Sequence, residues 1–244
     1  MRTRPSPALP PPTSQEDLLP QLHGAALLFD MDGTLVDSTA LVESTWAGFS
    51  DQHGLDLEQV LAFAHGRPTA KTVGHFIPDP RLAASETRRL VACEESQTAG
   101  ITQVPGAREL LAALPQGSWA VVTSAGRKLA TVRLAAAGLP VPEVLVSADD
   151  VTHGKPHPEG YLLAAAVLGA EPAATIVFED SEAGVRAGLA SGGRTVVIGT
   201  LATRDGVCER YADFRGFQVT ADPARPGVVL TLPEPVAVGP TARL

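Results

Sequence analysis

The stretch that decides the fold is Ala25–Ser38, which reads AALLFDMDGTLVDS. Its apolar start has the length of a strand and the continuous hydrophobicity of a strand covered on both faces. The run ends in Asp30, Asp32 and Gly33, residue types that are depleted in strands, and buried carboxylates without compensation are costly. An Asp-Gly turn would explain only the last two of these residues. Because residues two apart point to the same side of an extended chain, Asp30 and Asp32 are predicted to reach one ligand site beyond the end of the strand.

Four more short apolar runs have the same character, and helical patterns lie between most of them. The runs are Trp119–Thr123, Glu143–Ser147, Thr175–Phe178 and Thr195–Ile198. The helical patterns cover Arg127–Ala137, Pro158–Leu168 and Ser181–Ala190. Strands that alternate with helices indicate an α/β fold with a doubly wound, mostly parallel sheet.

A long gap breaks this rhythm, because about ninety residues separate the first strand from the second. The gap holds helical patterns at Thr39–His53, Leu57–Ala64, Ala70–Phe76 and Arg81–Glu95. We therefore predict a helical domain over residues 39–104, inserted into a core domain made of residues 21–38 and 105–244. The proline-rich residues 1–20 are expected to be a disordered or extended N-terminal extension. Near the other end, Val228–Leu232 is expected to be an edge strand.

Composition excludes several classes of partner. The formal net charge is −8, and the basic residues are scattered, so nucleic acids and anionic membranes are not expected partners. No apolar run approaches the length of a membrane span. The sequence has only two cysteines and no CxxC motif, which disfavours a disulfide framework and predicts a cytoplasmic protein.

The segment DMDGTLVDS, residues 30–38, resembles the first motif, DxDGT, of the haloacid dehalogenase superfamily. This resemblance implies a Rossmann-like core and a phosphoryl-transfer site. It gives Asp30 the role of the nucleophile that becomes an aspartyl-phosphate. It gives Asp32 the role of the acid that protonates the leaving oxygen and then takes a proton from the hydrolytic water.

Two further motifs of that superfamily are matched in the same order along the chain. Val121–Ser124 resembles the second motif, which implies that the Thr123 hydroxyl and the Ser124 amide bind phosphate oxygens; Ser124 alone would equally suit a helix cap. The segment GKPHP, residues 154–158, resembles the third motif, with Lys155 as the cation that offsets the charge of phosphate and nucleophile. The alternative for Lys155 is a solvated surface lysine.

The fourth motif is matched by Glu179-Asp180-Ser181, which follows a predicted strand. The resemblance implies a Mg²⁺ site held by Asp30, the backbone carbonyl of Asp32 and Asp180, with Glu179 as a further candidate ligand. Such an oxygen-only ligand set is the kind that Mg²⁺ prefers. An acidic pair at this position is also compatible with part of a capping box.

The helical insert resembles the small α-helical cap domains of sugar-phosphate and glycerol-phosphate phosphatases. This resemblance places Glu43 and Arg67 as candidate substrate-binding residues, with Glu43 accepting bonds from sugar hydroxyls and Arg67 meeting the phosphate or a polar group. His65 could take either of these two roles. Glu43 could also be an ordinary solvated helix residue, and Trp46 fits a core position better than a sugar platform.

Together these motifs predict a Mg²⁺-dependent phosphatase that hydrolyses a small sugar, polyol or glycerol phosphate. Asp32 argues against a dehalogenase, because a halide leaves without a proton. A phosphotransferase related to β-phosphoglucomutase is the main alternative, and a non-catalytic binding protein on the same scaffold is a third. The expected ligand is a small phosphate monoester, and the expected assembly is a monomer or a weak homodimer.

Overall fold

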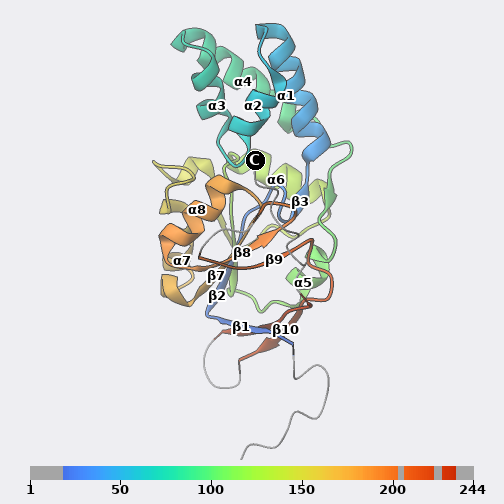
Figure 1. The fold of residues 1–244 in the computed structure, drawn as a ribbon, viewed down its shortest axis with the longest axis vertical. Coiled ribbons are helices and arrows are strands. Elements are labelled where there is room, and N and C mark those ends of the chain that lie inside the picture. The colour runs from blue at the N-terminus through green and yellow to red at the C-terminus, as the bar shows by residue number, and fades with distance from the viewer. Residues whose placement is uncertain (1–18, 203–205, 223–226, 235–244) are drawn as a thin grey trace, which may run out of the picture.

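The computed structural model describes residues 19–202, 206–222 and 227–234 of the chain. Six strands in these ranges form one sheet in the order β6-β5-β2-β7-β8-β9, and every neighbouring pair is parallel (Figure 1). The strands are β2 (Ala26–Phe29), β5 (Trp119–Val122), β6 (Val144–Val146), β7 (Thr175–Glu179), β8 (Arg194–Ile198) and β9 (Val207–Tyr211). The predicted parallel α/β fold is confirmed, and β9 is a strand that the apolar pattern did not reveal. Most of the extension predicted to be disordered, residues 1–18, lies outside the described residues.

Helices cover both faces of this sheet. The helices are α5 (Ala107–Ala113), α6 (Arg127–Ala136), α7 (Glu159–Val167) and α8 (Glu182–Ser191), and 3₁₀ turns occur at Ala148–Asp150 and Pro172–Ala174. Strand β2 shows how the two layers form, because alternate side chains of a strand point to opposite faces. Leu27 and Phe29 pack in one apolar cluster with α5 and α6, whereas Leu28 packs in another with α7 and α8. A strand buried on both sides explains the continuous apolar run that the sequence shows.

The helical insert forms a separate lobe at one end of the molecule (Figure 1). It contains α1 (Thr39–His53), α2 (Leu57–Ala64), α3 (Thr69–Phe76) and α4 (Pro80–Ser96). These helices share an apolar cluster of their own, in which Trp46 and Phe49 pack edge to face. The chain leaves and re-enters the core through β3 (Val36–Asp37) and β4 (Thr102–Gln103), which pair antiparallel. No helix in the described residues is both long and apolar enough to cross a bilayer.

A small antiparallel sheet lies at the opposite end of the molecule (Figure 1). Its order is β1-β11-β10, with β1 at Gln21–Gly24, β10 at Gln218–Ala221 and β11 at Val228–Thr231. The expectation of an edge strand at Val228–Leu232 was wrong, because β11 is the middle strand of this sheet. Val228 and Leu230 are fully buried and join the main core. One partner, β1, lies far earlier in the chain, so the local sequence does not show that β11 is paired on both sides.

Candidate active site

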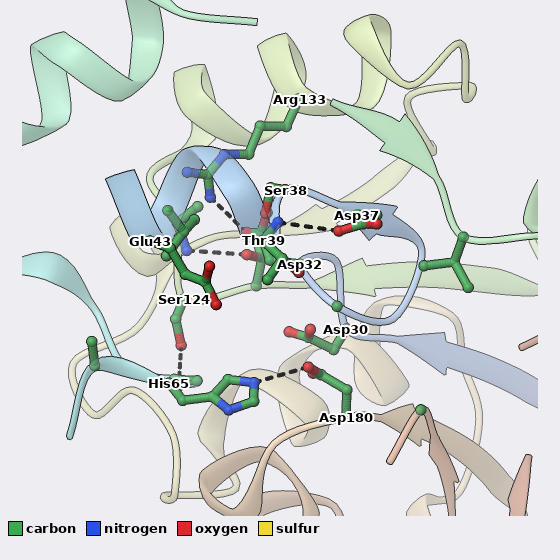
Figure 2. Close-up of a pocket in the computed structure, with 18 of the residues that line it drawn as sticks. Asp30, Asp32, Asp37, Ser38, Thr39, Glu43, His65, Ser124, Arg133 and Asp180 are labelled. Carbon is green, nitrogen blue, oxygen red and sulfur yellow. Dashed lines mark hydrogen bonds and ion pairs between the residues drawn. The ribbon is translucent and has the colours of Figure 1, made fainter. Parts of the chain in front are cut away.

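The predicted site residues meet at the carboxyl edge of the parallel sheet (Figure 2). Asp30 follows β2, Thr123 follows β5, and Asp180 follows β7. Since these three strands are neighbours and run in the same direction, their ends present side chains to one place. Lys155 reaches the same place from the loop before α7.

Lys155 is a buried cation with two carboxylate partners. Its Nζ contacts Asp30 Oδ1, lies 2.6 Å from Glu179 Oε1 and donates to the Val122 carbonyl at 3.1 Å. Burial favours the neutral amine, but the Asp30 and Glu179 carboxylates together raise the pKa of Lys155 above its ordinary value. Lys155 is 5% exposed, so the alternative of a solvated surface lysine does not apply.

Glu179 is fully buried, and both of its carboxylate oxygens accept bonds from protein groups. Oε1 accepts from Lys155 and from the Tyr161 hydroxyl, the latter at 2.7 Å. Oε2 accepts from the Asp180 amide at 3.1 Å and from the Ser181 amide and hydroxyl at 3.2 and 3.1 Å. These bonds hold Glu179 in a position that orients Lys155. Tyr161 was not predicted as a partner, because a tyrosine inside an apolar helical pattern is typical of a core residue.

Three acids form a cluster that suits a hard divalent cation. One carboxylate oxygen from each of Asp30, Glu179 and Asp180 lies within 4.8 Å of the others. Burial raises the pKa of Asp30 well above its ordinary value, Lys155 opposes this shift, and the Glu179 and Asp180 carboxylates add to it. Burial likewise raises the pKa of Asp180. Burial therefore makes these carboxylates costly to keep charged without a cation, and an oxygen-only donor set of this kind fits Mg²⁺.

The approach of the first motif to Asp180 depends on Gly33. Gly33 has φ +85°, and a Cβ atom at this position would lie 1.9 Å from Asp180 Oδ2. From the other side, His65 Nε2 of the helical insert lies 2.9 Å from the same oxygen (Figure 2). This hydrogen bond raises the pKa of His65. The insert therefore touches one of the candidate metal ligands directly.

Asp32 points away from Asp30 and toward helix α6 (Figure 2). Its Oδ1 accepts from the Ser38 hydroxyl at 2.7 Å, and its Oδ2 pairs with Arg133 Nη1 at 2.8 Å. Arg133 was not among the predicted site residues. The available signal was a charged residue four positions after Leu129, on the buried side of α6.

Thr123 and Ser124 occupy the loop between β5 and α6. The Thr123 hydroxyl accepts from the Ala125 amide at 3.0 Å, and Thr123 is buried next to the acids. The Ser124 hydroxyl donates to the Gly66 carbonyl of the helical insert at 3.0 Å. The N-cap of α6 is Gly126, and the first amide of the helix, that of Arg127, donates to Asp149 at 2.8 Å, so the alternative role of Ser124 as a helix cap does not apply.

A cavity of about 650 Å³ joins these groups to the helical insert. Asp30, Thr123 and Asp180 line it from the core, and Glu43 and Arg67 line it from the insert. Figure 2 shows the Glu43 side chain directed toward the space above Asp30. Arg67, in contrast, donates to the Phe63 carbonyl at 2.5 Å and covers the Phe63 ring, so in this conformation its guanidinium is held by α2.

Comparisons with known proteins agree with this arrangement. A family model described as haloacid dehalogenase-like hydrolase matches residues 25–192. Hexitol phosphatase A from Escherichia coli is 45% identical over 179 residues, which cover 72% of this chain and 83% of the relative. Glycerol-1-phosphate phosphohydrolase 2 from Saccharomyces cerevisiae is 35% identical over 201 residues, covering 77% and 80%. A hydrolase from Pseudomonas syringae has a similar solved structure, with a TM-score of 0.68 at 25% identity, covering 78% of this chain and 94% of that one.

Proposed function

The chain belongs to the haloacid dehalogenase-like hydrolase family and is a phosphoric monoester hydrolase, and we propose that it acts on a sugar or polyol phosphate through an aspartyl-phosphate on Asp30, with Mg²⁺ as cofactor. The observation that carries this proposal is the buried contact between Lys155 and Asp30 beside Asp180, at the bottom of a cavity roofed by the helical insert. A carboxylate, a cation and an acidic ion site around one point are the groups that phosphoryl transfer requires.

In the first step, a carboxylate oxygen of Asp30 attacks phosphorus, and the bond from phosphorus to the sugar oxygen breaks. A phosphate dianion repels the attacking carboxylate, so the positive charge of Lys155 must offset this repulsion. Thr123 and the Ser124 amide hold the remaining phosphate oxygens in line. The sugar alkoxide is a poor leaving group, and it takes a proton from Asp32, whose carboxyl group must first turn from Arg133 toward the leaving oxygen.

In the second step, water attacks the phosphorus of the aspartyl-phosphate, and Asp32 takes one of its protons. The bond from phosphorus to Asp30 breaks, which releases inorganic phosphate and regenerates both carboxyl groups for the next cycle. Asp30 and Asp180, with the Asp32 carbonyl, would hold Mg²⁺, and the ion would supply charge neutralisation at the phosphate oxygens. Because both oxygens of Glu179 already bind protein groups, we assign Glu179 the role of orienting Lys155 rather than that of a direct ligand.

The substrate class follows from the lining of the cavity. We propose that residues 39–104 act as a cap domain over the core, so that the leaving group lies between the two. Glu43 would accept hydrogen bonds from substrate hydroxyls, and Arg67 would meet a polar group once it leaves Phe63. The two phosphatase relatives act, by their names, on hexitol and glycerol phosphates, which are small molecules rich in hydroxyl groups.

A substrate screen tests this proposal. The purified chain is incubated with hexitol phosphates, hexose phosphates, pentose phosphates and glycerol 1-phosphate, and released inorganic phosphate is measured with Mg²⁺ and with a chelator. We expect release from at least one polyol or sugar phosphate, loss of activity with the chelator and recovery on addition of Mg²⁺. Asp30→Asn serves as the blank and should reduce the rate by at least about 10³-fold. Turnover by that variant, or turnover of no ester in the panel, would refute the proposal.

The same screen separates the hydrolase from a phosphotransferase. A mutase converts one sugar phosphate into its isomer and releases little inorganic phosphate, whereas a hydrolase releases one phosphate for each ester consumed. Following the sugar product by NMR alongside phosphate release therefore distinguishes the two. We expect the amount of inorganic phosphate released to equal the amount of dephosphorylated sugar product formed.

A further inference from the structure

The buried arginine beside Asp32 has no role in the chemistry described so far. We propose that Arg133 is a positioning residue, which holds the Asp32 carboxyl group in the position seen here, turned away from Asp30, and couples its release toward the leaving oxygen to the helical insert through Glu94. This inference rests on the proposed role of Asp32 as the general acid.

The geometry of Arg133 joins three parts of the chain. Arg133 comes from core helix α6, Asp32 from the catalytic loop after β2, and Glu94 from insert helix α4. The two terminal nitrogens of the guanidinium divide between the two acids. Nη1 lies 2.8 Å from Asp32 Oδ2, and Nη2 lies 2.7 Å from Glu94 Oε1. A planar guanidinium presents its donors in fixed directions, so the position of either acid constrains the other.

Because these ion pairs are largely buried, their charges are costly unless each charge keeps its partner. The side chains of Arg133 and Glu94 are 4% and 6% exposed, and both line the cavity that reaches Asp30. Two carboxylates share one cation here, and burial raises the pKa of Glu94 above its ordinary value. Moving either acid away from Arg133 would leave an uncompensated charge. The three side chains therefore keep a defined geometry relative to one another.

Both carboxylate oxygens of Asp32 accept a bond from a protein side chain. Ser38, which precedes insert helix α1, donates to Oδ1 at 2.7 Å, while Arg133 holds Oδ2. Both bonds therefore involve groups at the boundary between core and insert. Movement of the insert relative to the core would therefore change the direction and the charge environment of the acid.

The chain offers a matched control in the same interface. One residue from Glu94, Glu95 forms an ion pair with Lys128 at 2.6 Å, and it too joins α4 to α6. The Lys128 side chain is 74% exposed, and neither residue lines the cavity. A variant of Lys128 or Glu95 therefore removes a contact between insert and core while leaving Asp32 untouched.

The test compares two leaving groups. An alkoxide needs a proton from Asp32 as it departs, whereas p-nitrophenolate departs as a stable anion. The ratio of kcat/KM for a hexitol phosphate to kcat/KM for p-nitrophenyl phosphate reports the contribution of the acid, because kcat/KM covers steps up to departure of the leaving group. The ratio is measured for the wild type, Asp32→Asn, Arg133→Lys, Glu94→Gln and Lys128→Met, with thermal unfolding of each as a check on folding.

We expect the ratio to fall by about 10²-fold in Asp32→Asn and to stay within about twofold of the wild type in Lys128→Met. We expect it to fall by about tenfold in Glu94→Gln, which leaves the cation to Asp32 alone, and to change by about tenfold in Arg133→Lys, because lysine cannot hold both acids in the same geometry. If Arg133→Lys and Glu94→Gln change both rates equally, or change neither, the inference is overturned and the ion pair only docks the insert. If Asp32→Asn itself leaves the ratio unchanged, the acid role of Asp32 fails, which is a failure of the proposed function. Glu94→Gln retains the size of the side chain, so it remains informative if Arg133→Lys folds poorly.

Discussion

Gly33 shows how one residue fixes the relation between the first and fourth motifs. Its backbone is left-handed, and the carboxylate of Asp180 occupies the space where a side chain would begin. We predict that Gly33→Ala lowers kcat for the best polyol phosphate by about 10²-fold, because displacement of a reacting group by about 1 Å has an effect of this size. Steady-state kinetics at saturating Mg²⁺ measure kcat. A second series at varied Mg²⁺ gives the concentration that supports the half-maximal rate, and we expect this concentration to rise.

Gly48→Ala is the matched control for this substitution. Gly48 lies in helix α1, and a Cβ atom there meets nothing within 4 Å. Alanine favours the helix by about 0.5–1 kcal/mol, so this variant should keep its activity and gain slightly in stability. Activity of Gly33→Ala within about twofold of the wild type would show that the close approach to Asp180 does not matter for catalysis.

At the residue scale, the acids and the cation that belong to sequence motifs were predictable, whereas residues whose role depends on distant partners were not. Asp30 and Asp180 are marked as acids at strand ends, and Lys155 is marked by its place between Gly154 and Pro156. Arg133 and Tyr161 lie inside regular helices, and their partners are 101 and 18 positions away in the chain. Only the packing of α6 and α7 against the sheet brings them to the acids.

At the scale of elements, helix α4 carries a buried acid that holds the helical insert together. Glu86 is 6% exposed, accepts from Gln52 at 3.2 Å and pairs with Arg89 at 2.7 Å. The hydrogen bond from Arg89 is the main cause that lowers the pKa of Glu86 below its ordinary value of 4.5. A carboxyl group with a lowered folded-state pKa adds stability above its unfolded pKa and loses that contribution as the pH falls through the folded pKa.

We predict that Glu86→Gln lowers the free energy of unfolding by about 1 kcal/mol at pH 7. The difference between the variant and the wild type should shrink as the pH is lowered from about 5 to 3, where Glu86 of the wild type becomes protonated. Urea unfolding at several pH values, followed by circular dichroism, measures this. A difference that stays constant over the whole range would mean that the charge of Glu86 contributes nothing to stability.

Most of the helices and strands were predictable from the sequence. The strands that were missed or misplaced share a physical cause. Strands β2, β5 and β7 are buried on both faces, so their apolar runs are continuous and their ends are sharp. Strand β10 is mostly exposed and carries a polar pattern, and β11 takes its central position from β1, about two hundred residues earlier in the chain. A local pattern contains no information about such a partner.

At the scale of the whole molecule, the helical insert and the core meet at the cavity through Gly66 as well as through the ion pairs. Gly66 has φ +71°, and a Cβ atom there would lie 2.3 Å from the Ser181 hydroxyl. The Gly66 carbonyl also accepts from Ser124, which belongs to the candidate phosphate loop. Close docking of the two parts therefore requires a residue without a side chain, and that docking is what would exclude water from the reaction.

We predict that Gly66→Ala holds the insert away from the core. KM for the polyol phosphate should rise by about tenfold, because contacts from Glu43 and the rest of the insert are lost, and kcat should fall as water enters the site. Gly74→Ala, in helix α3 of the same insert, is the control, since a Cβ atom there meets nothing within 4 Å. Small-angle scattering should show a larger radius of gyration for Gly66→Ala than for Gly74→Ala, with similar melting temperatures for both. Unchanged kinetics with an unchanged radius would mean that the core and the insert accommodate the methyl group, and that docking at Gly66 does not control access to Asp30.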